Sequence, residues 1–192
     1  MDSRSQARVS DLPAEVSGST PARRRRRRMP ILIAAALLFV LLTAVAVTYL
    51  AGGFHEDGRF AAEPPACATV EASLPLLGTD YDAKQTGANN CELLYPPDHP
   101  DYIPHPKINI QLYVATPRRE DAPDAASRLL KDLGTSFQPL PGIGEEAYVR
   151  NRDVFFRVSN LVVGVVVYPL QDSSDEQVHA FAADLADRLA TT

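Results

Sequence analysis

Two cysteines are the residues of this chain with the most definite chemistry. Cys67 and Cys91 lie 24 positions apart, and both follow the long apolar stretch of the sequence. Outside a membrane, such a pair is typical of a structural disulfide, which stabilises a fold by about 3 kcal/mol in the loop-entropy account. A metal site needs more ligands, and a reactive thiol needs a positively charged neighbourhood that neither cysteine has. We therefore predict a Cys67–Cys91 disulfide.

A second set of candidate ligands lies in a proline-rich loop, residues 96–106. Two histidines and two carboxylates could ligate zinc or copper there: Asp98, His99, Asp101 and His105. Their spacing matches no metal pattern with a mechanism behind it, and the prolines hold the backbone extended, which spreads ligands apart. We predict a stiff loop that faces solvent or a partner, and no metal.

Two further features could bind an anion. Pro141–Glu146 has the glycines of a phosphate loop but lacks the lysine and the preceding strand, so we interpret it as a tight turn into a strand. Arg150, Arg152 and Arg157 could meet an anionic ligand or pair with acidic side chains, and both readings stay open. No serine lies in a nucleophile-elbow pattern. We predict no catalytic residue and no cofactor, and we do not expect an enzyme.

The position of all these residues depends on one apolar stretch, Ile31–Ala51. It is 21 residues long and carries no charge, glycine or proline. At about 1.5 Å per residue it makes a helix of roughly 31 Å, the thickness of a hydrocarbon core. A buried helix of a soluble core is the alternative. We predict a single transmembrane helix.

The flanks of this stretch predict its orientation. Six consecutive arginines precede it, whereas the other side has no basic residue before Arg59. The six are Arg23, Arg24, Arg25, Arg26, Arg27 and Arg28. Positive charge beside a span stays cytoplasmic, so we expect the N-terminus inside and the C-terminal part outside. A nucleic-acid patch or a nuclear signal is the alternative for such a run.

Cleavage of the span is a separate question. Ala44-Val45-Ala46 has the form of a signal-peptidase site, but the apolar run continues to Leu50 and exceeds the usual length of a signal peptide core. Cys67 lies too far from the run to be a lipid-modified cysteine. We expect a retained anchor in the cell membrane.

Charge divides the chain in two. Residues 1–30 hold eight arginines against three carboxylates, a formal charge of +5, whereas residues 52–192 hold 11 basic and 21 acidic residues, a charge of −10. An acidic outer part argues against nucleic acid as a partner. We predict a disordered basic cytoplasmic tail (1–30), the span (31–51), a flexible linker (52–65) and one extracytoplasmic domain (66–192).

The first half of this domain mixes helix and strand patterns. Apolar spacing predicts a helix from Ala66 that ends at Gly78, followed by a polar loop over residues 79–90. Residues 91–95 form a short expected strand, and residues 107–115 alternate as a half-buried one. Asp121 is expected to cap a helix that runs to Leu133.

The second half predicts an antiparallel meander and a last helix. The strands are residues 146–150, 154–159 and 161–168, and the last is apolar on both faces, as a central strand would be. Ser173 with Glu176 has the spacing of a capping box, and an apolar stripe from Val178 to Leu189 follows. We expect an α+β fold: an antiparallel sheet of about four to five strands with helices packed on one face.

Several of these segments resemble small exported proteins of actinobacteria. The resemblance rests on Cys67 in a helix, Cys91 opening a strand, and the segments Pro141–Tyr148 and Phe156–Val163. Such proteins include envelope lipoproteins and the extracellular sensor domains of some membrane Ser/Thr kinases. The resemblance covers roughly residues 67–190 and implies a compact α+β domain with a helix–strand disulfide and no catalytic residues. This chain differs in its anchor and has no kinase domain.

These observations favour a single-pass membrane protein that displays a binding or sensory domain in the cell envelope. Its ligand could be a cell-wall component, a small molecule or another envelope protein, bound through the sheet face or the proline loop. The alternatives are an accessory subunit of an envelope membrane complex and, third, an envelope hydrolase that uses His99 or His105.

Overall fold

A computed structural model describes residues 25–51, 53, 55–116, 120–169 and 171–192. The predicted disordered tail, together with Arg23 and Arg24, lies largely outside these residues. The chain divides into two compact units, Met1–Thr48 and Tyr49–Thr192, which are described separately below.

The first unit is built on a single long helix, α1 (Arg25–Leu50). It begins six residues before the predicted span and ends one residue before the predicted end. Within the described residues, Ile33–Leu50 is the one helical segment long and apolar enough to cross a membrane, with a mean hydropathy of 2.5. The hydroxyls of Thr43 and Thr48 donate to the carbonyls of Phe39 and Ala44 one turn earlier, at 2.9 and 2.8 Å. Both threonine hydroxyls are therefore satisfied within the helix, which suits a helix surrounded by lipid.

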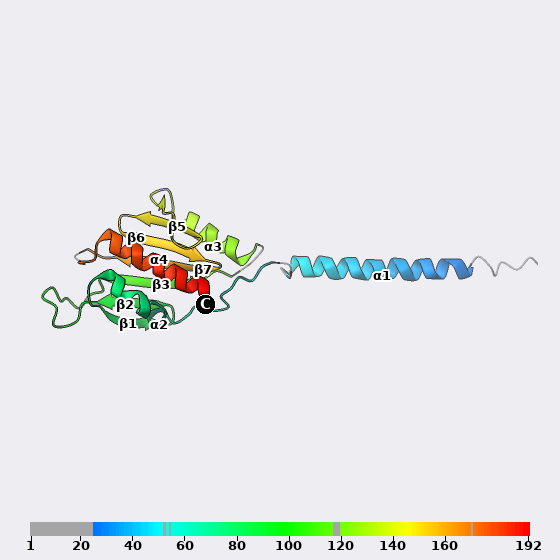
Figure 1. Cartoon of the computed structure of the whole chain (residues 1–192). Helices are drawn as coiled ribbons and strands as arrows, with labels where there is room; N and C mark the ends of the chain where they lie inside the picture. Colours follow the sequence, from blue (N-terminus) through cyan, green and yellow to red (C-terminus); the bar gives the residue numbers. More distant parts are fainter. Residues whose placement is uncertain (1–24, 52, 54, 117–119, 170) are drawn as a thin grey trace, which may run out of the picture. The chain divides into compact units, whose positions relative to one another are not determined.

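The second unit contains one antiparallel sheet of seven strands, in the order β1-β2-β3-β7-β6-β5-β4 (Figure 1). The prediction of four to five strands was therefore too low. The most apolar strand, β7, lies fourth of seven, which confirms its predicted central place. The strands are β1 (Asp82–Gly87), β2 (Asn90–Leu94), β3 (Ile108–Val114), β4 (Gln138–Pro139), β5 (Glu146–Arg150), β6 (Asp153–Val158) and β7 (Leu161–Val167).

The strand β1 occupies the segment that was predicted as a polar loop. All six of its side chains are exposed, so no hydrophobic alternation marks it in the sequence. It forms because Ala88 and Asn89 turn the chain back and the backbone pairs with β2. The Gln85 carboxamide oxygen also accepts a hydrogen bond from the Cys67 amide at 2.9 Å, which fixes β1 to the neighbouring helix.

One face of the sheet carries the main hydrophobic core. Alternate side chains of β3, β6 and β7 are buried there against α2 (Ala66–Val70), the 3₁₀ helix η2 (Glu71–Leu77) and α4 (Asp175–Thr191). The predicted stripe of the last helix is confirmed by the buried side chains from Val178 to Leu189. Its capping box is formed by Ser174 and Gln177, one residue after the predicted pair, because the Ser174 hydroxyl reaches the Gln177 amide at 3.2 Å.

The helix α3 (Ala122–Lys131) packs on the opposite face of the sheet, which corrects the expectation that all helices share one face (Figure 1). Ala125 and Ala126 pack with Val162, and Ser127 bonds to Glu146. Successive side chains of a strand point to opposite faces, and the neighbours of Val162 and Glu146 belong to the main core. Helices therefore cover both faces of the sheet at β6, which contacts α3 on one side and α4 on the other.

The start of α3 also differs from its prediction. Asp121 precedes the helix, but its carboxylate does not cap it. It accepts instead from the amide of Glu56 at 2.7 Å, in the segment that was predicted to be a flexible linker. Further hydrogen bonds hold residues 59 and 60 against the turn between β6 and β7. Residues 56–60 of the predicted linker therefore pack on the domain.

The predicted disulfide is present. The sulfur atoms of Cys67 and Cys91 are 2.10 Å apart, and the bond joins α2 to β2. Cys91 is fully buried in the main core. The disulfide therefore ties α2 to β2, the strand next to the β1 edge of the sheet.

Candidate functional site

The proline-rich loop, residues 96–106, connects the adjacent strands β2 and β3. Its base is fixed by two backbone hydrogen bonds: the Lys107 amide donates to the Leu93 carbonyl at 2.8 Å, and the Tyr168 amide donates to the Lys107 carbonyl at 2.9 Å. The loop therefore leaves the end of the sheet where β3 begins and β7 ends. The connection from β7 to α4, which contains Asp172, leaves the sheet at the same end.

Three rings stack at the base of this loop. The Tyr95 ring is buried, and its centroid lies 5.5 Å from that of Tyr81 and 4.0 Å from that of His99, with nearly parallel planes. The ammonium group of Lys107, a buried residue, lies 4.7 Å from the Tyr95 centroid, within the range of a cation–π contact. Stacking on a buried ring holds the His99 imidazole in one orientation.

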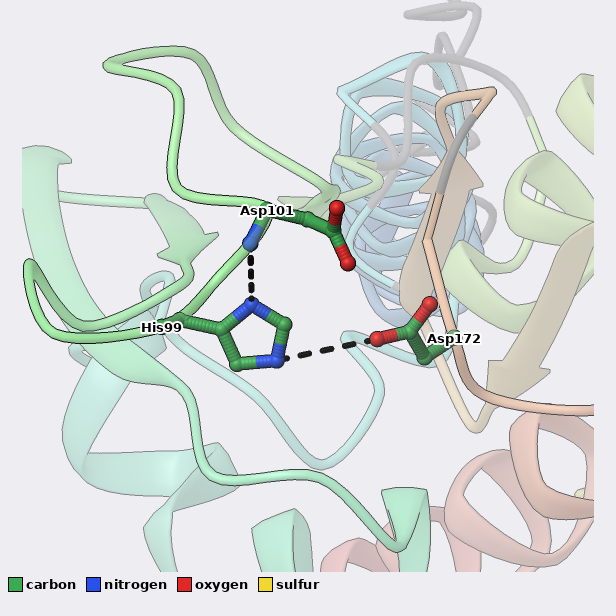
Figure 2. Close-up of side chains that lie close together, drawn as sticks. All are labelled: His99, Asp101 and Asp172. Carbon is green, nitrogen blue, oxygen red and sulfur yellow. Dashed lines mark hydrogen bonds and ion pairs between the residues drawn. The ribbon is translucent and has the colours of Figure 1, made fainter.

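His99 is also held at both of its nitrogens (Figure 2). The Asp101 amide donates to Nδ1 at 3.1 Å, and Nε2 lies 3.7 Å from a carboxylate oxygen of Asp172. His99 and Asp101 were predicted as possible ligands from the sequence, whereas Asp172, which is far away in the chain, was not. The three ligand atoms lie within 4.8 Å of one another. Asp98 and His105 lie outside this group.

A polar network continues behind the rings. The Asp172 amide donates to the Tyr95 hydroxyl at 2.7 Å, and the Tyr81 hydroxyl lies 2.9 Å from the Ser173 hydroxyl. The Gln171 carboxamide bridges the Ser173 amide and carbonyl. Burial raises the pKa of both tyrosine hydroxyls above the ordinary value of 10.0, so both stay neutral at physiological pH. Their role is to position the backbone of residues 171–173.

The hydrogen bonds of His99 argue against a metal at this group. Because Nδ1 accepts from a backbone N–H, it carries no proton, and the proton of a neutral imidazole lies on Nε2, toward Asp172. A metal would need the lone pair of one nitrogen, but one lone pair is already used and the other position is protonated. The geometry favours a histidine whose Nε2 faces the Asp172 carboxylate at 3.7 Å.

The same contacts bear on catalysis. A general base needs an accessible lone pair, and the Nδ1 lone pair of His99 already accepts from the Asp101 amide. The nearest hydroxyl nucleophile of the network, Ser173, is buried and bonded to Tyr81. The arrangement is that of a rigid wall, suited to binding.

A pocket of about 450 Å³ opens beside this wall. Its volume falls in the range of small-molecule sites. Tyr102 and Ile103 are partly exposed there and offer apolar surface, whereas Asp101 and Asp172 offer carboxylates. The lining residues are Pro100, Asp101, Tyr102, Ile103, Lys107, Gln171 and Asp172.

The three arginines singled out in the sequence do not form a joint site. Arg157 pairs with Glu145 and Glu146, and Arg152 pairs with Asp175. Arg150 lies over the Phe137 ring, with its guanidinium carbon 4.5 Å from the centroid, and pairs with Asp153. The reading in which they meet acidic side chains is the one that the contacts support.

The glycine-rich segment is a tight turn into β5, as predicted. Gly142 and Gly144 have φ values of 89° and 56°, the left-handed region that favours glycine. A side chain on Gly144 would place its Cβ atom 2.4 Å from the Arg157 carbonyl oxygen. The glycine is needed for the close approach of two backbones, which explains it without a phosphate.

Comparison of the chain with protein-family models, curated proteins and solved structures found no match. The resemblance to actinobacterial envelope proteins therefore stays a prediction, and the function has to be argued from the site.

Proposed function

We propose that this protein is a single-pass membrane protein whose α+β domain is an extracytoplasmic binding or sensory module. The pocket beside the proline-rich loop carries the proposal. It combines the size of a small-molecule site with walls whose side chains are fixed by stacking and hydrogen bonds. Preorganised walls lower the cost of ordering on binding, which is the physical requirement for a ligand site.

The chemistry of the pocket narrows the class of ligand. The carboxylates of Asp101 and Asp172 suit amine and hydroxyl groups, and the partly exposed Tyr102 and Ile103 suit an apolar or ring surface. Amino sugars, cell-wall fragments and short peptides combine these features. We propose a ligand from this group.

The proposed orientation is supported by the sequence flanks and by the apolar helix. The arginine run precedes the span, and the segment after it has no basic residue before Arg59. The chain enters the α+β domain beside Asn160, where β7 begins, whereas the pocket lies where β7 ends. The entering chain therefore leaves the pocket open.

A ligand screen on the full chain in detergent tests the proposal. We expect at least one of a set of cell-wall muropeptides, amino sugars and short peptides to raise the melting temperature of the wild-type chain. The double variant Asp101→Asn with Asp172→Asn should lose this shift. The double variant Asp82→Asn with Asp124→Asn, which removes two carboxylates outside the pocket, should keep it. An equal shift in all three proteins would contradict the pocket as the site.

The main alternative is an accessory subunit of an envelope membrane complex. Every described side chain of the apolar helix is exposed and could contact a partner span. Exchange of residues 31–51 for an unrelated span separates the two roles. A binding module should keep its function and its ligand shift, whereas a subunit should lose capture of its membrane partner in a pull-down.

A further inference from the structure

Residues 56–60, which we call the strap, are held against the domain by side chains from several elements. The Glu56 amide donates to Asp121 at 2.7 Å, and the Arg59 amide donates to the Ser159 hydroxyl at 3.0 Å. The Phe60 amide donates to the side-chain oxygen of Asn160 at 2.9 Å. In each case the acceptor is a side chain, so these three bonds depend on where the ends of other elements lie.

Asn160 is the central anchor. It is almost fully buried, and its amide nitrogen donates to the carbonyls of Phe60 at 2.8 Å and of Asp57 and Ala115 at 3.3 Å. The strap is shaped to fit it: Gly58 has a φ of +78°, and a Cβ atom there would lie 2.3 Å from the Asn160 side chain. One side chain thus joins the strap to the end of β3 and the start of β7.

A second anchor involves the last turn of α4. The Arg59 guanidinium donates to the carbonyls of Leu189, at 3.4 Å, and of Ala190. These carbonyls have no partner within the helix and carry its negative dipole end, so a cation there is favourable. Docking of the strap therefore depends on the position of the end of α4.

Two of the elements that hold the strap also border the pocket. The strand β7 begins beside Asn160 and runs to the pocket end of the sheet. The helix α4 begins three residues after Asp172 and ends at the carbonyls that Arg59 contacts. Packed helices move as rigid bodies by small translations, so a shift at the start of α4 would also move its end.

We propose that docking of the strap is coupled to the state of the pocket through α4 and β7, so that the strap transmits ligand binding toward the membrane anchor. This inference rests on the proposed function and names its regulation. The strap can dock only when the end of α4 and the start of β7 hold their present positions. Its docking therefore depends on how these two elements lie relative to each other. Release of Asn160 or of the α4 end would free the chain that leads to the span.

Hydrogen exchange of the full chain in detergent micelles tests the coupling without a ligand. Tyr95→Phe removes the acceptor of the Asp172 amide at the pocket. We expect exchange of the strap amides of Glu56, Arg59 and Phe60 to become at least about fivefold faster, the lower range of measured allosteric couplings. Amides of β3, which report global opening, should change less.

The matched control is Tyr148→Phe, which removes the hydrogen bond from the Tyr148 hydroxyl to Glu146 on β5, off the proposed route. It should leave strap exchange unchanged. Asn160→Ala, which removes the central anchor, should accelerate strap exchange directly. If strap exchange in Asn160→Ala is unchanged, the role of Asn160 as the anchor of the strap is contradicted.

Unchanged strap exchange in Tyr95→Phe, or a rise shared equally with β3 or with Tyr148→Phe, would overturn the coupling. The ligand screen separates this result from failure of the proposed function. A retained ligand shift with unchanged strap exchange overturns the coupling alone, whereas the binding role fails only if the screen fails.

Discussion

Tyr95 is the residue that joins the walls of the pocket to one another. Its ring is stacked between those of Tyr81 and His99, and its hydroxyl accepts from the Asp172 amide. The backbone of the proline-rich loop and that of the connection before α4 are therefore fixed through one buried side chain. A binding site needs side chains that are already held in place before the ligand arrives, because less order then has to be created on binding.

The backbone conformation of Gly144 and its close contact with Arg157 lead to a prediction about stability. Gly144→Ala places a side chain at a φ of 56° and brings its Cβ atom within 2.4 Å of the Arg157 carbonyl oxygen. We expect a loss of about 3 kcal/mol in the free energy of unfolding, from the left-handed backbone and the steric overlap. Urea denaturation measures it. Gly87→Ala, whose nearest contact would be 3.8 Å, is the control, and an equal loss there would contradict the account.

The disulfide makes a second prediction. Cys67→Ser opens a loop of 24 residues and should lower the free energy of unfolding by about 3 kcal/mol. The effect should be reproduced by reductant in the wild-type chain and be absent when reductant is added to the variant. Equal melting temperatures of the wild-type chain with and without reductant would contradict a stabilising disulfide.

At the scale of residues, two kinds of interacting pair could be predicted from the sequence: residues that are close in the chain, and residues whose chemistry allows only one partner. The disulfide is of the second kind. His99 and Asp101 were recognised as a possible group, but the third member, Asp172, enters only because β3 and β7 are neighbours in the sheet. Tyr95 carried no signal beyond a strand pattern. The polar run of residues 171–174, placed directly after the central strand, was the one available hint.

At the scale of elements, α3 packs on β5, β6 and β7, and β6 also contacts α4 on the other face of the sheet. The contact of α3 with these strands includes a partly buried charge cluster. Glu146 accepts from Ser127 and Tyr148 and pairs with Arg157 at 3.1 Å. Burial raises the pKa of Glu146, but these hydrogen bonds outweigh it, and the pKa lies below its ordinary value of 4.5.

This lowered pKa predicts the acid response of the domain. Because the unfolded chain binds the proton at higher pH than the folded chain, the stability from Glu146 is complete above about pH 4.5 and is lost as pH falls through the native pKa. The difference in unfolding free energy between the wild type and Glu146→Gln should therefore shrink as pH falls from about 5 to 3. Urea denaturation at several pH values measures it.

The variant Ser127→Ala gives the control for this titration. It removes one donor that lowers the pKa of Glu146, so the loss of stability should begin at higher pH than in the wild type. If the difference in unfolding free energy between the wild type and Glu146→Gln stayed constant from pH 7 to pH 3, Glu146 would contribute nothing to the loss of stability in acid.

Elements with hydrophobic periodicity were predicted well, and those without it were not. The strand β3 alternates buried and exposed side chains, and β7 is buried along most of its length, so both appear in the sequence. The strand β1 is exposed on both faces and forms through backbone pairing alone. The face on which α3 packs also could not be predicted, because its apolar stripe fits either side of the sheet.

At the scale of the whole molecule, an apolar helix and an α+β domain occupy separate compact units. The sequence predicted this division from composition, because the change from apolar to polar residues after position 51 is abrupt. The packing of residues 56–60 on the domain was missed, since it depends on Asn160 and Asp121, which lie more than 60 positions further along the chain.

We propose that a retained N-terminal anchor displays the domain outside the cytoplasm. Protease digestion of intact protoplasts that express the chain with a tag at each end tests it most directly. We predict a membrane-bound product that keeps both tags, with the C-terminal tag removed by external protease and the N-terminal tag protected until lysis. A protected C-terminal tag, or a membrane-bound product without the N-terminal tag, would contradict the account.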